Sequence, residues 1–104
     1  MARAERGDVW LTDLGLAAKV RPCLILNVPP SPRGRMLITL APHTTSVRGS
    51  SFEIAVPKPF LRRGAFDGQG IITVTPPRLL RRLGRLDVRE LESVEAGVRR
   101  WLGL

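Results

Sequence analysis

Short apolar runs alternate with breaks rich in glycine and proline over most of the chain. The residues from Val9 to Leu11 lie between two glycines, and the run that begins at Cys23 follows a proline and stops before two more. The unbroken apolarity of the Cys23 run indicates a strand that is covered on both faces. Later runs alternate or carry β-branched residues, which also favours strands. The pattern predicts strands over residues 9–11, 23–28, 36–40, 51–56 and 70–74.

After residue 75 the spacing of apolar positions changes from the period of a strand to that of a helix. Prolines at 76 and 77 followed by Gly84 predict a short helix between them. Asp87 and Glu90 form a capping box that opens a second helix. Strands followed by a terminal helix predict a small, mainly β, barrel-like α+β domain. The second helix carries an apolar stripe of Val88, Leu91, Val94, Val98, Trp101 and Leu102.

The chain has 104 residues and a formal charge of +8, from 17 Lys and Arg against 9 Asp and Glu. This length corresponds to a single domain over residues 1–104. No stretch is long and apolar enough for a membrane span, and the N-terminal residues lack the apolar core of an export signal. We therefore expect a cytoplasmic protein without a membrane partner, whose charge favours a polyanion.

The chain has a single cysteine, Cys23, and a single histidine, His43. These two residues can form neither an internal disulfide nor the usual zinc site, and an acid–base nuclease with two histidines is excluded. The phosphate-binding and dinucleotide-binding glycine motifs are also absent from the sequence. We therefore expect no metal and no other cofactor.

Four motifs occur in order along the first half of the chain. They are Arg6-Gly7-Asp8-Val9-Trp10, Asp13-Leu14-Gly15, Arg21-Pro22 before the apolar run, and His43-Thr44-Thr45-Ser46. Together they resemble the MazF/PemK family, the toxins of type II toxin–antitoxin pairs. The resemblance implies a small SH3-like barrel of the CcdB/MazF type, a homodimer and a cognate acidic antitoxin.

The resemblance also implies a metal-independent endoribonuclease, an mRNA interferase that cuts single-stranded RNA at a short sequence. In that reaction the 2′-hydroxyl attacks the adjacent phosphorus and leaves a 2′,3′-cyclic phosphate and a 5′-hydroxyl. Because the nucleophile belongs to the RNA, the protein supplies positioning, proton transfer and charge stabilisation. A small basic chain is suited to that task.

Arg21 and Thr44 are the first candidates for catalysis. Arg21 resembles the family's catalytic arginine, and its planar guanidinium can bind two phosphate oxygens at once. Thr44 resembles the family's functional threonine at the end of the third strand, where its hydroxyl can donate to a phosphoryl oxygen. The alternatives are an ordinary surface arginine and a threonine that satisfies its own turn.

His43 and Asp67 are further acid–base candidates. Histidine is the side chain that normally titrates near neutrality, but a histidine beside a strand end is as often structural. Asp67 resembles an acidic residue that lies beside the family's catalytic arginine, where it could accept a proton or orient Arg21. Alternatively it stabilises a turn. The candidates for RNA binding are Lys19, Thr45, Ser46, Arg48 and Gln69.

Two departures from the family pattern affect this assignment. The segment 15–21 is shorter than the usual loop and lacks its acidic and glutamine residues, and Ile72 stands where an arginine is often found. Two other functions remain open. One is a gyrase-poisoning toxin of the CcdB type, acting through the last helix, and the other is a non-catalytic barrel that binds RNA through its charge.

Two groups of side chains have both a functional and a structural interpretation. Trp10 and Phe52 could stack on bases, although a place in the core is the better interpretation. Four arginines would share one face of the first predicted helix, where they could meet phosphates or form a solvated face partly paired with Glu90, Glu92 and Glu95. We prefer the solvated face. These arginines are Arg78, Arg81, Arg82 and Arg85.

Overall fold

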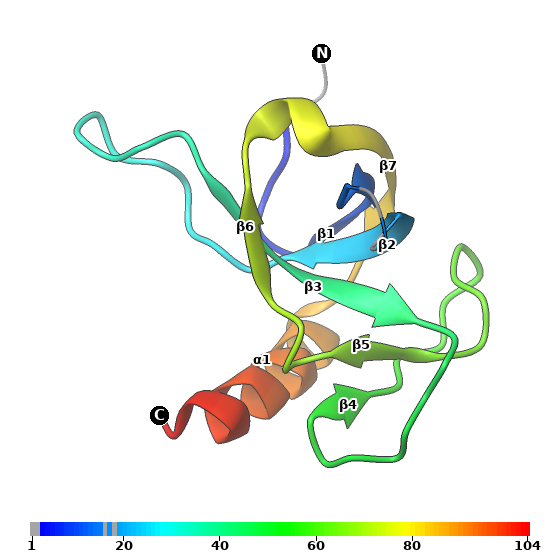
Figure 1. Ribbon diagram of the computed structural model, residues 1–104. Helices are drawn as coiled ribbons and strands as arrows, with labels where there is room; N and C mark the ends of the chain where they lie inside the picture. The colour runs from blue at the N-terminus through cyan, green and yellow to red at the C-terminus, as the bar shows by residue number, and fades with distance from the viewer. Residues whose placement is uncertain (1–2, 16, 18) are drawn as a thin grey trace.

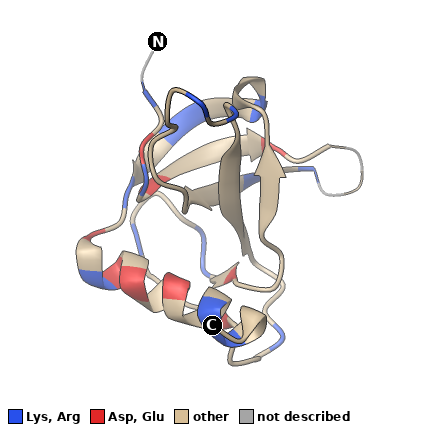
Figure 2. Ribbon diagram, turned by 90° about the vertical axis from the view of Figure 1, so that its left-hand side faces the viewer, with Lys and Arg blue, Asp and Glu red and all other residues tan. Residues whose placement is uncertain are grey.

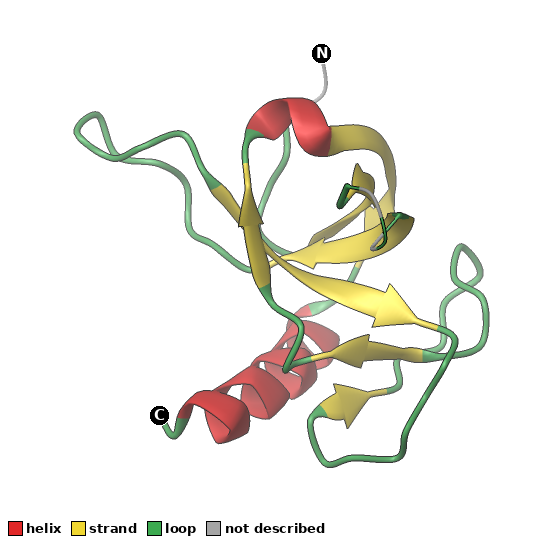
Figure 3. Ribbon diagram, in the orientation of Figure 1, coloured by secondary structure: helices red, strands yellow, loops and turns green. Residues whose placement is uncertain are grey.

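The computed structural model describes residues 3–15, 17 and 19–104. This part of the chain folds into strands that precede a single C-terminal α-helix (Figure 1, Figure 3). No helix among the described residues is long and apolar enough to cross a membrane. The elements are β1 (Asp8–Asp13), β2 (Val20–Ile25), β3 (Ile38–Thr44), β4 (Glu53–Ile54), β5 (Ala65–Asp67), β6 (Ile72–Val74), the 3-10 turn η1 (Pro76–Arg78), β7 (Leu79–Arg85) and α1 (Val88–Leu102).

The seven strands form one antiparallel sheet in the order β4-β5-β3-β2-β1-β7, with β6 paired to β3 beside this path. β3 is the central strand, because it pairs with β6 at its start, with β2 in its middle and with β5 at its end. The sheet bends around these pairings and does not close, and α1 packs against its lower part in the view of Figure 1. The predicted barrel-like α+β domain with a C-terminal helix is confirmed.

The predicted strands correspond to β1, β2, β3, β4 and β6, with shifted bounds. β2 begins at Val20 instead of Cys23, and β3 starts at Ile38 and runs to Thr44. Both strands therefore continue through a proline that the sequence pattern treats as a break. β5 and β7 were not predicted, and β5 has only three residues, too few to show an alternating pattern.

The predicted helix after the two prolines is wrong. The prolines open only the turn η1, and Leu79–Arg85 forms β7, which pairs with β1. This pairing satisfies the backbone groups along one edge of β1, whereas a helix of that length is marginal on its own. Gly84 does not end a helix. It leaves room for the ring of Phe60, which lies 2.4 Å from where a Cβ on residue 84 would stand.

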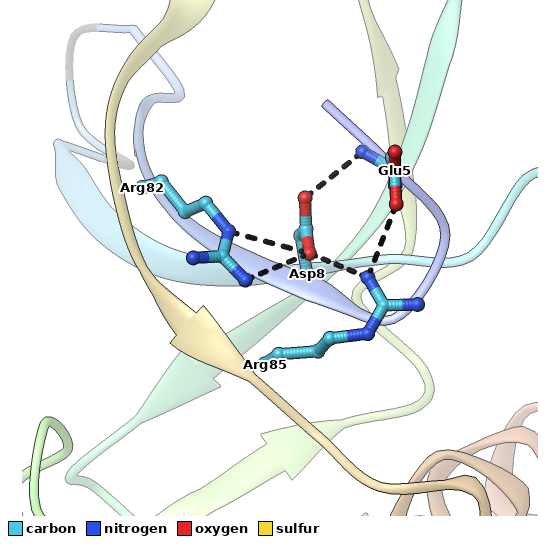
Figure 4. Close-up of polar contacts among 4 residues, drawn as sticks. All are labelled: Glu5, Asp8, Arg82 and Arg85. Carbon is cyan, nitrogen blue, oxygen red and sulfur yellow. Dashed lines mark hydrogen bonds and ion pairs between the residues drawn. The ribbon is translucent and has the colours of Figure 1, made fainter. Parts of the chain in front are cut away.

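Arginines of β7 bind acids at the start of the chain instead of the expected acids of α1 (Figure 4). The nearly buried Asp8 has its Oδ1 at 2.7 Å from Nη1 of Arg85 and at 3.4 Å from Nε of Arg82. Oδ2 of Asp8 accepts a hydrogen bond from the backbone N–H of Glu5 at 3.0 Å. One buried carboxylate therefore holds β7 against β1.

The residues before β1 connect the sheet to α1. The guanidinium of Arg6 donates to the carbonyl of Leu26 and pairs with Glu95 on the helix. Gly7 has a φ of +91°, a conformation that favours glycine, and its backbone bonds to the end of β2 and to the segment before α1. With Asp8 bound to β7, the whole Arg6-Gly7-Asp8 motif has a structural role in this chain.

Helix α1 begins with the predicted capping box. The N–H of Glu90 donates to Oδ1 of Asp87 at 2.8 Å, and the N–H of Asp87 donates to Oε1 of Glu90 at 2.9 Å. Acidic residues recur on successive turns of the helix (Figure 2). The apolar stripe is buried only in its middle, at Val94, while exposed side chains stand at its ends. These exposed side chains are Val88, Trp101 and Leu102.

Two clusters of buried side chains lie on opposite faces of the sheet. Neighbouring positions of β1 and β2 alternate between the clusters, which confirms cover on both faces for residues 23–25 of the predicted run, whereas Val28 at its end is exposed. Burial raises the pKa of the Cys23 thiol to about 11. The cluster facing α1 contains Val9, Leu24, Ala41, Val56, Phe66, Leu86 and Val94. The other contains Trp10, Cys23, Ile25 and Leu40, so that Trp10 belongs to the core.

Replacing Asp8 with asparagine should lower the free energy of unfolding by about 1–3 kcal/mol, because a buried charged acceptor is lost. Arg82 and Arg85 are about half exposed, so water keeps this cost below that of a fully buried pair. Asp13→Asn is the matched control, because the contact between Asp13 and Arg78 is 3.7 Å long and half exposed. The control should lose less than about 0.5 kcal/mol. Urea titration measures both, and equal losses would contradict the role given to Asp8.

Candidate functional site

A groove of about 640 Å³ lies where the end of β3, the start of β2 and the turn after β5 meet. It brings together the catalytic candidates Arg21, Thr44 and Asp67 from three different strands. The RNA-binding candidates Ser46, Arg48 and Gln69 line the same groove. Arg21 and Gln69 are more than forty positions apart in the sequence, yet they line the same groove.

Strand register explains why these side chains meet. Side chains directly opposite each other in an antiparallel pair lie on the same face of the sheet. Cys23 is opposite Pro42, and Thr44 is opposite Ala65. Two residues further along the strands, Arg21 and Asp67 therefore share the face of Thr44. The groove is the polar continuation of the face whose inner part forms the cluster around Trp10 and Cys23.

His43 lies on the opposite face of β3 and does not line the groove. Its side chain is buried, and its ring packs edge to face on Phe66 with 5.0 Å between ring centroids. Burial lowers the pKa of His43, so that the imidazole is neutral at physiological pH. The structure thus gives His43 the structural environment that the sequence analysis offered as the alternative to catalysis.

Thr44 forms the turn that was its structural interpretation, and it also lines the groove. Its Oγ1 accepts a hydrogen bond from the backbone N–H of Ser46 at 3.0 Å, which is the turn expected from a Thr-Thr-Ser sequence. A hydroxyl that accepts one bond can still donate its own hydrogen. The turn fixes the position of the Thr44 oxygen in the groove and leaves its chemistry available to a ligand.

Asp67 likewise holds a turn and lines the groove. Its Oδ1 accepts the backbone N–H of Gln69 at 3.0 Å. A Cβ on Gly70 would stand 2.7 Å from Oδ2 of Asp67, so glycine leaves the room that this carboxylate occupies. The turn presents the acidic group and the amide of Gln69 side by side to the same groove.

Glu53 is a groove residue that the sequence analysis missed. Its carboxylate accepts the backbone N–H of Arg48 at 3.0 Å and that of Ser50 at 2.9 Å. These two hydrogen bonds lower the pKa of Glu53, and the bond from the backbone of Arg48 has the larger effect. The acid therefore organises the loop that carries Ser46 and Arg48. A single acid between apolar residues of a predicted strand gives no sequence signal of such a role.

Trp101 is the second residue of the groove that was missed, since helical spacing assigned it to the core stripe of α1.

Two RNA-binding candidates lie elsewhere. Thr45 lines a separate hollow of about 770 Å³ with Arg62 and Arg63. Lys19 is exposed in the connection between β1 and β2, has a φ of 59°, and is not among the residues that line the groove. The shortened segment 15–21 includes residues 16 and 18, which lie outside the described part of the chain.

The side chains that line the groove offer the groups that a phosphodiester can bind. Arg21 and Arg48 supply cations, Thr44 and Ser46 supply hydroxyls, and Asp67 supplies a proton acceptor. Among the described residues, no cluster of three or more His, Cys, Asp or Glu could hold a metal ion.

Solved structures of toxins have the same fold. The chain shares 22% identity and a TM-score of 0.83 with an endoribonuclease from a mycobacterial species in complex with its cognate antitoxin, over 98% of this chain and 97% of that one. For the Mycobacterium tuberculosis toxin MazF-mt6 the values are 24% and 0.77, over 93% and 97%. For MazF in a MazE–MazF structure from Deinococcus radiodurans they are 21% and 0.80, over 100% and 99%.

No curated protein matches the chain in sequence. Residues 5–102, however, match the family described as the PemK-like, MazF-like toxin of type II toxin–antitoxin systems. Since this match spans all but the ends of the chain, and the fold is that of the MazF structures, the protein belongs to the PemK-like, MazF-like toxin family.

Proposed function

We propose that this toxin is a metal-independent, sequence-specific endoribonuclease that cuts single-stranded RNA by attack of the 2′-hydroxyl. The observation that carries the proposal is the groove in which Arg21, Thr44 and Asp67 converge from three strands. Relatives of the same fold are described as endoribonucleases, which supports the same reaction class.

In the proposed reaction the scissile phosphate lies in the groove. The fork of Arg21 binds two phosphoryl oxygens and stabilises the charge that builds on them as the phosphorus becomes five-coordinate. Thr44 donates its hydroxyl hydrogen to one of these oxygens. Arg21 is not the base, because a guanidinium stays protonated up to a pH of about 12.

Asp67 takes the proton of the attacking 2′-hydroxyl. As the new bond between O2′ and phosphorus forms, the bond from phosphorus to O5′ breaks. The departing oxygen gains a proton from water in the open groove. The products are a 2′,3′-cyclic phosphate on one fragment and a 5′-hydroxyl on the other, and no electrons leave or enter the system.

The proposal includes two protein partners. A cognate antitoxin with an acidic segment would compete with RNA for the cations of the groove, as charge complementarity favours. A second copy of the chain would lengthen the track for phosphates, because one groove carries few cations. The structures of an endoribonuclease with its cognate antitoxin and of MazE with MazF support the first partner.

Purified protein incubated with a long single-stranded RNA in EDTA should produce discrete fragments with cyclic phosphate and 5′-hydroxyl ends.

Arg21→Ala should lower the cleavage rate about a hundredfold or more, since such donors contribute about 2.7–4 kcal/mol to the transition state. Arg21→Lys should restore little, because a point charge lacks the fork. Arg81→Ala is the matched control for loss of one positive charge outside the groove.

Cleavage by Arg21→Ala within threefold of the Arg81→Ala rate would contradict the assignment of Arg21. RNA that is bound but not cut by the wild-type protein would favour the non-catalytic barrel. Loss of gyrase activity without any cut RNA would favour the CcdB-like alternative.

Titration of the cleavage assay with the cognate antitoxin should reduce cleavage and RNA affinity in parallel, and both effects should weaken with salt. Light scattering of the toxin alone should give twice the chain mass of 11.5 kDa. Complete inhibition at unchanged RNA affinity would exclude competition in the groove, and a monomeric mass would exclude the homodimer.

A further inference from the structure

Trp101, on the last turn of α1, lines the groove. Its side chain is 48% exposed, whereas the other tryptophan, Trp10, is 7% exposed and belongs to the core. A large aromatic side chain loses favourable burial when it remains in water. An exposed tryptophan in the same groove as Arg21 and Thr44 therefore needs an explanation other than folding.

Contacts on its inner side hold Trp101 in place. Phe52 packs against it edge to face, with 5.5 Å between ring centroids and 68° between ring planes. The preceding residue, Arg100, donates from its guanidinium to the carbonyl of Ser51 at 2.7 Å. The indole is therefore a positioned surface whose orientation need not be ordered again when a ligand arrives.

The last turns of α1 are themselves fixed against the sheet. A Cβ on Gly68, in the turn after β5, would lie 3.1 Å from backbone atoms of Gly97 and Val98. The turn that follows Asp67 thus touches the helix at Gly97 and Val98, and Figure 1 shows the end of β5 beside α1. This close approach connects the position of Trp101 to that of the candidate catalytic acid.

We propose that Trp101 is a stacking platform for one base of the single strand whose phosphate lies at Arg21, an inference that rests on the proposed function. Single-strand binding combines cations that follow the backbone with aromatic rings on which bases stack. Arg21 and Arg48 are the cations of this groove, and Trp101 is the aromatic ring among its lining residues. Phe52 supports the platform from behind instead of contacting the base.

RNA is favoured over a protein as the occupant because Trp101 shares the groove with the phosphate-binding candidates. Leu102 and Leu104, which are also exposed, do not line the groove. A patch for a protein partner would be expected to use these leucines together with Trp101. A base needs the indole alone.

Kinetic measurements on three variants test the platform. Trp101→Ala should lower kcat/KM for RNA cleavage by about 5- to 150-fold, which corresponds to a stacking contribution of about 1–3 kcal/mol per base. Trp101→Phe should keep most of the activity, because the ring is retained. Leu102→Ala is the matched control, being the adjacent residue with 49% exposure, and should stay within twofold of wild type. Equal kcat/KM for Trp101→Ala and Leu102→Ala would overturn the proposal.

A binding experiment keeps the inference separate from the proposed function. A 2′-deoxy strand of the cleaved sequence, or a mixed-sequence 2′-deoxy strand if the wild type cuts nothing, should quench the fluorescence of the wild-type protein. Trp101→Phe should lose that quenching, because Trp10 is buried. Absence of quenching in the wild type would overturn the stacking proposal whatever the cleavage result. Failure to cleave RNA with quenching intact would refute only the proposed function.

A scan of abasic sites along the strand identifies the stacked base. Removal of the base at one position should weaken binding to the wild-type protein. The same removal should not weaken binding to Trp101→Ala any further, since both changes delete the same contact. Additive losses at every position would overturn the proposal. If Trp101→Ala binds and cuts RNA normally but resists the antitoxin, the residue contacts protein, which also overturns it.

Discussion

The alternation of side chains along β3 is the constraint on which both the core and the groove depend. Thr44 and Pro42 face the groove, while Ala41 and His43 face the cluster packed on α1. Because the side-chain period of a strand is two, a shift of one residue would bury Thr44 and expose His43. The pairing of β3 with β2, β5 and β6 prevents that shift, since each partner adds its own register. The candidate site is therefore as well defined as the core behind it.

The charge of the chain divides into two parts with different tasks. Arg6, Arg82 and Arg85 are bound to acids of β1, α1 and the N-terminal segment, where they hold elements together. Arg21 and Arg48 line the groove beside Asp67 and Glu53. The net charge of +8 thus overstates the number of cations available to RNA at any one place. The proposed binding of a phosphodiester therefore depends on local arrangement more than on total charge.

Much of the fold could be predicted because most strands before residue 75, the short β5 excepted, and the capping box of α1 carry local signals. The prediction of a helix around Arg81 was wrong because this segment is stabilised as a strand by two distant parts of the chain. These are β1, with which it pairs, and the buried Asp8. The groove residues Arg21, Thr44 and Asp67 were found through a resemblance of motifs. Trp101 was missed because helical spacing alone does not tell where the sheet beneath a helix ends.

A single 2′-deoxynucleotide on the 5′ side of the scissile phosphate tests most directly whether the RNA supplies its own nucleophile in this groove. Two oligonucleotides of the same sequence, one of them carrying this substitution, would be compared at saturating protein in EDTA. If Arg21, Thr44 and Asp67 act on the 2′-hydroxyl, the substituted strand binds with similar affinity and is not cut at that position. Cleavage of the substituted strand at the same bond would mean that water or a side chain attacks the phosphorus, and would contradict the mechanism.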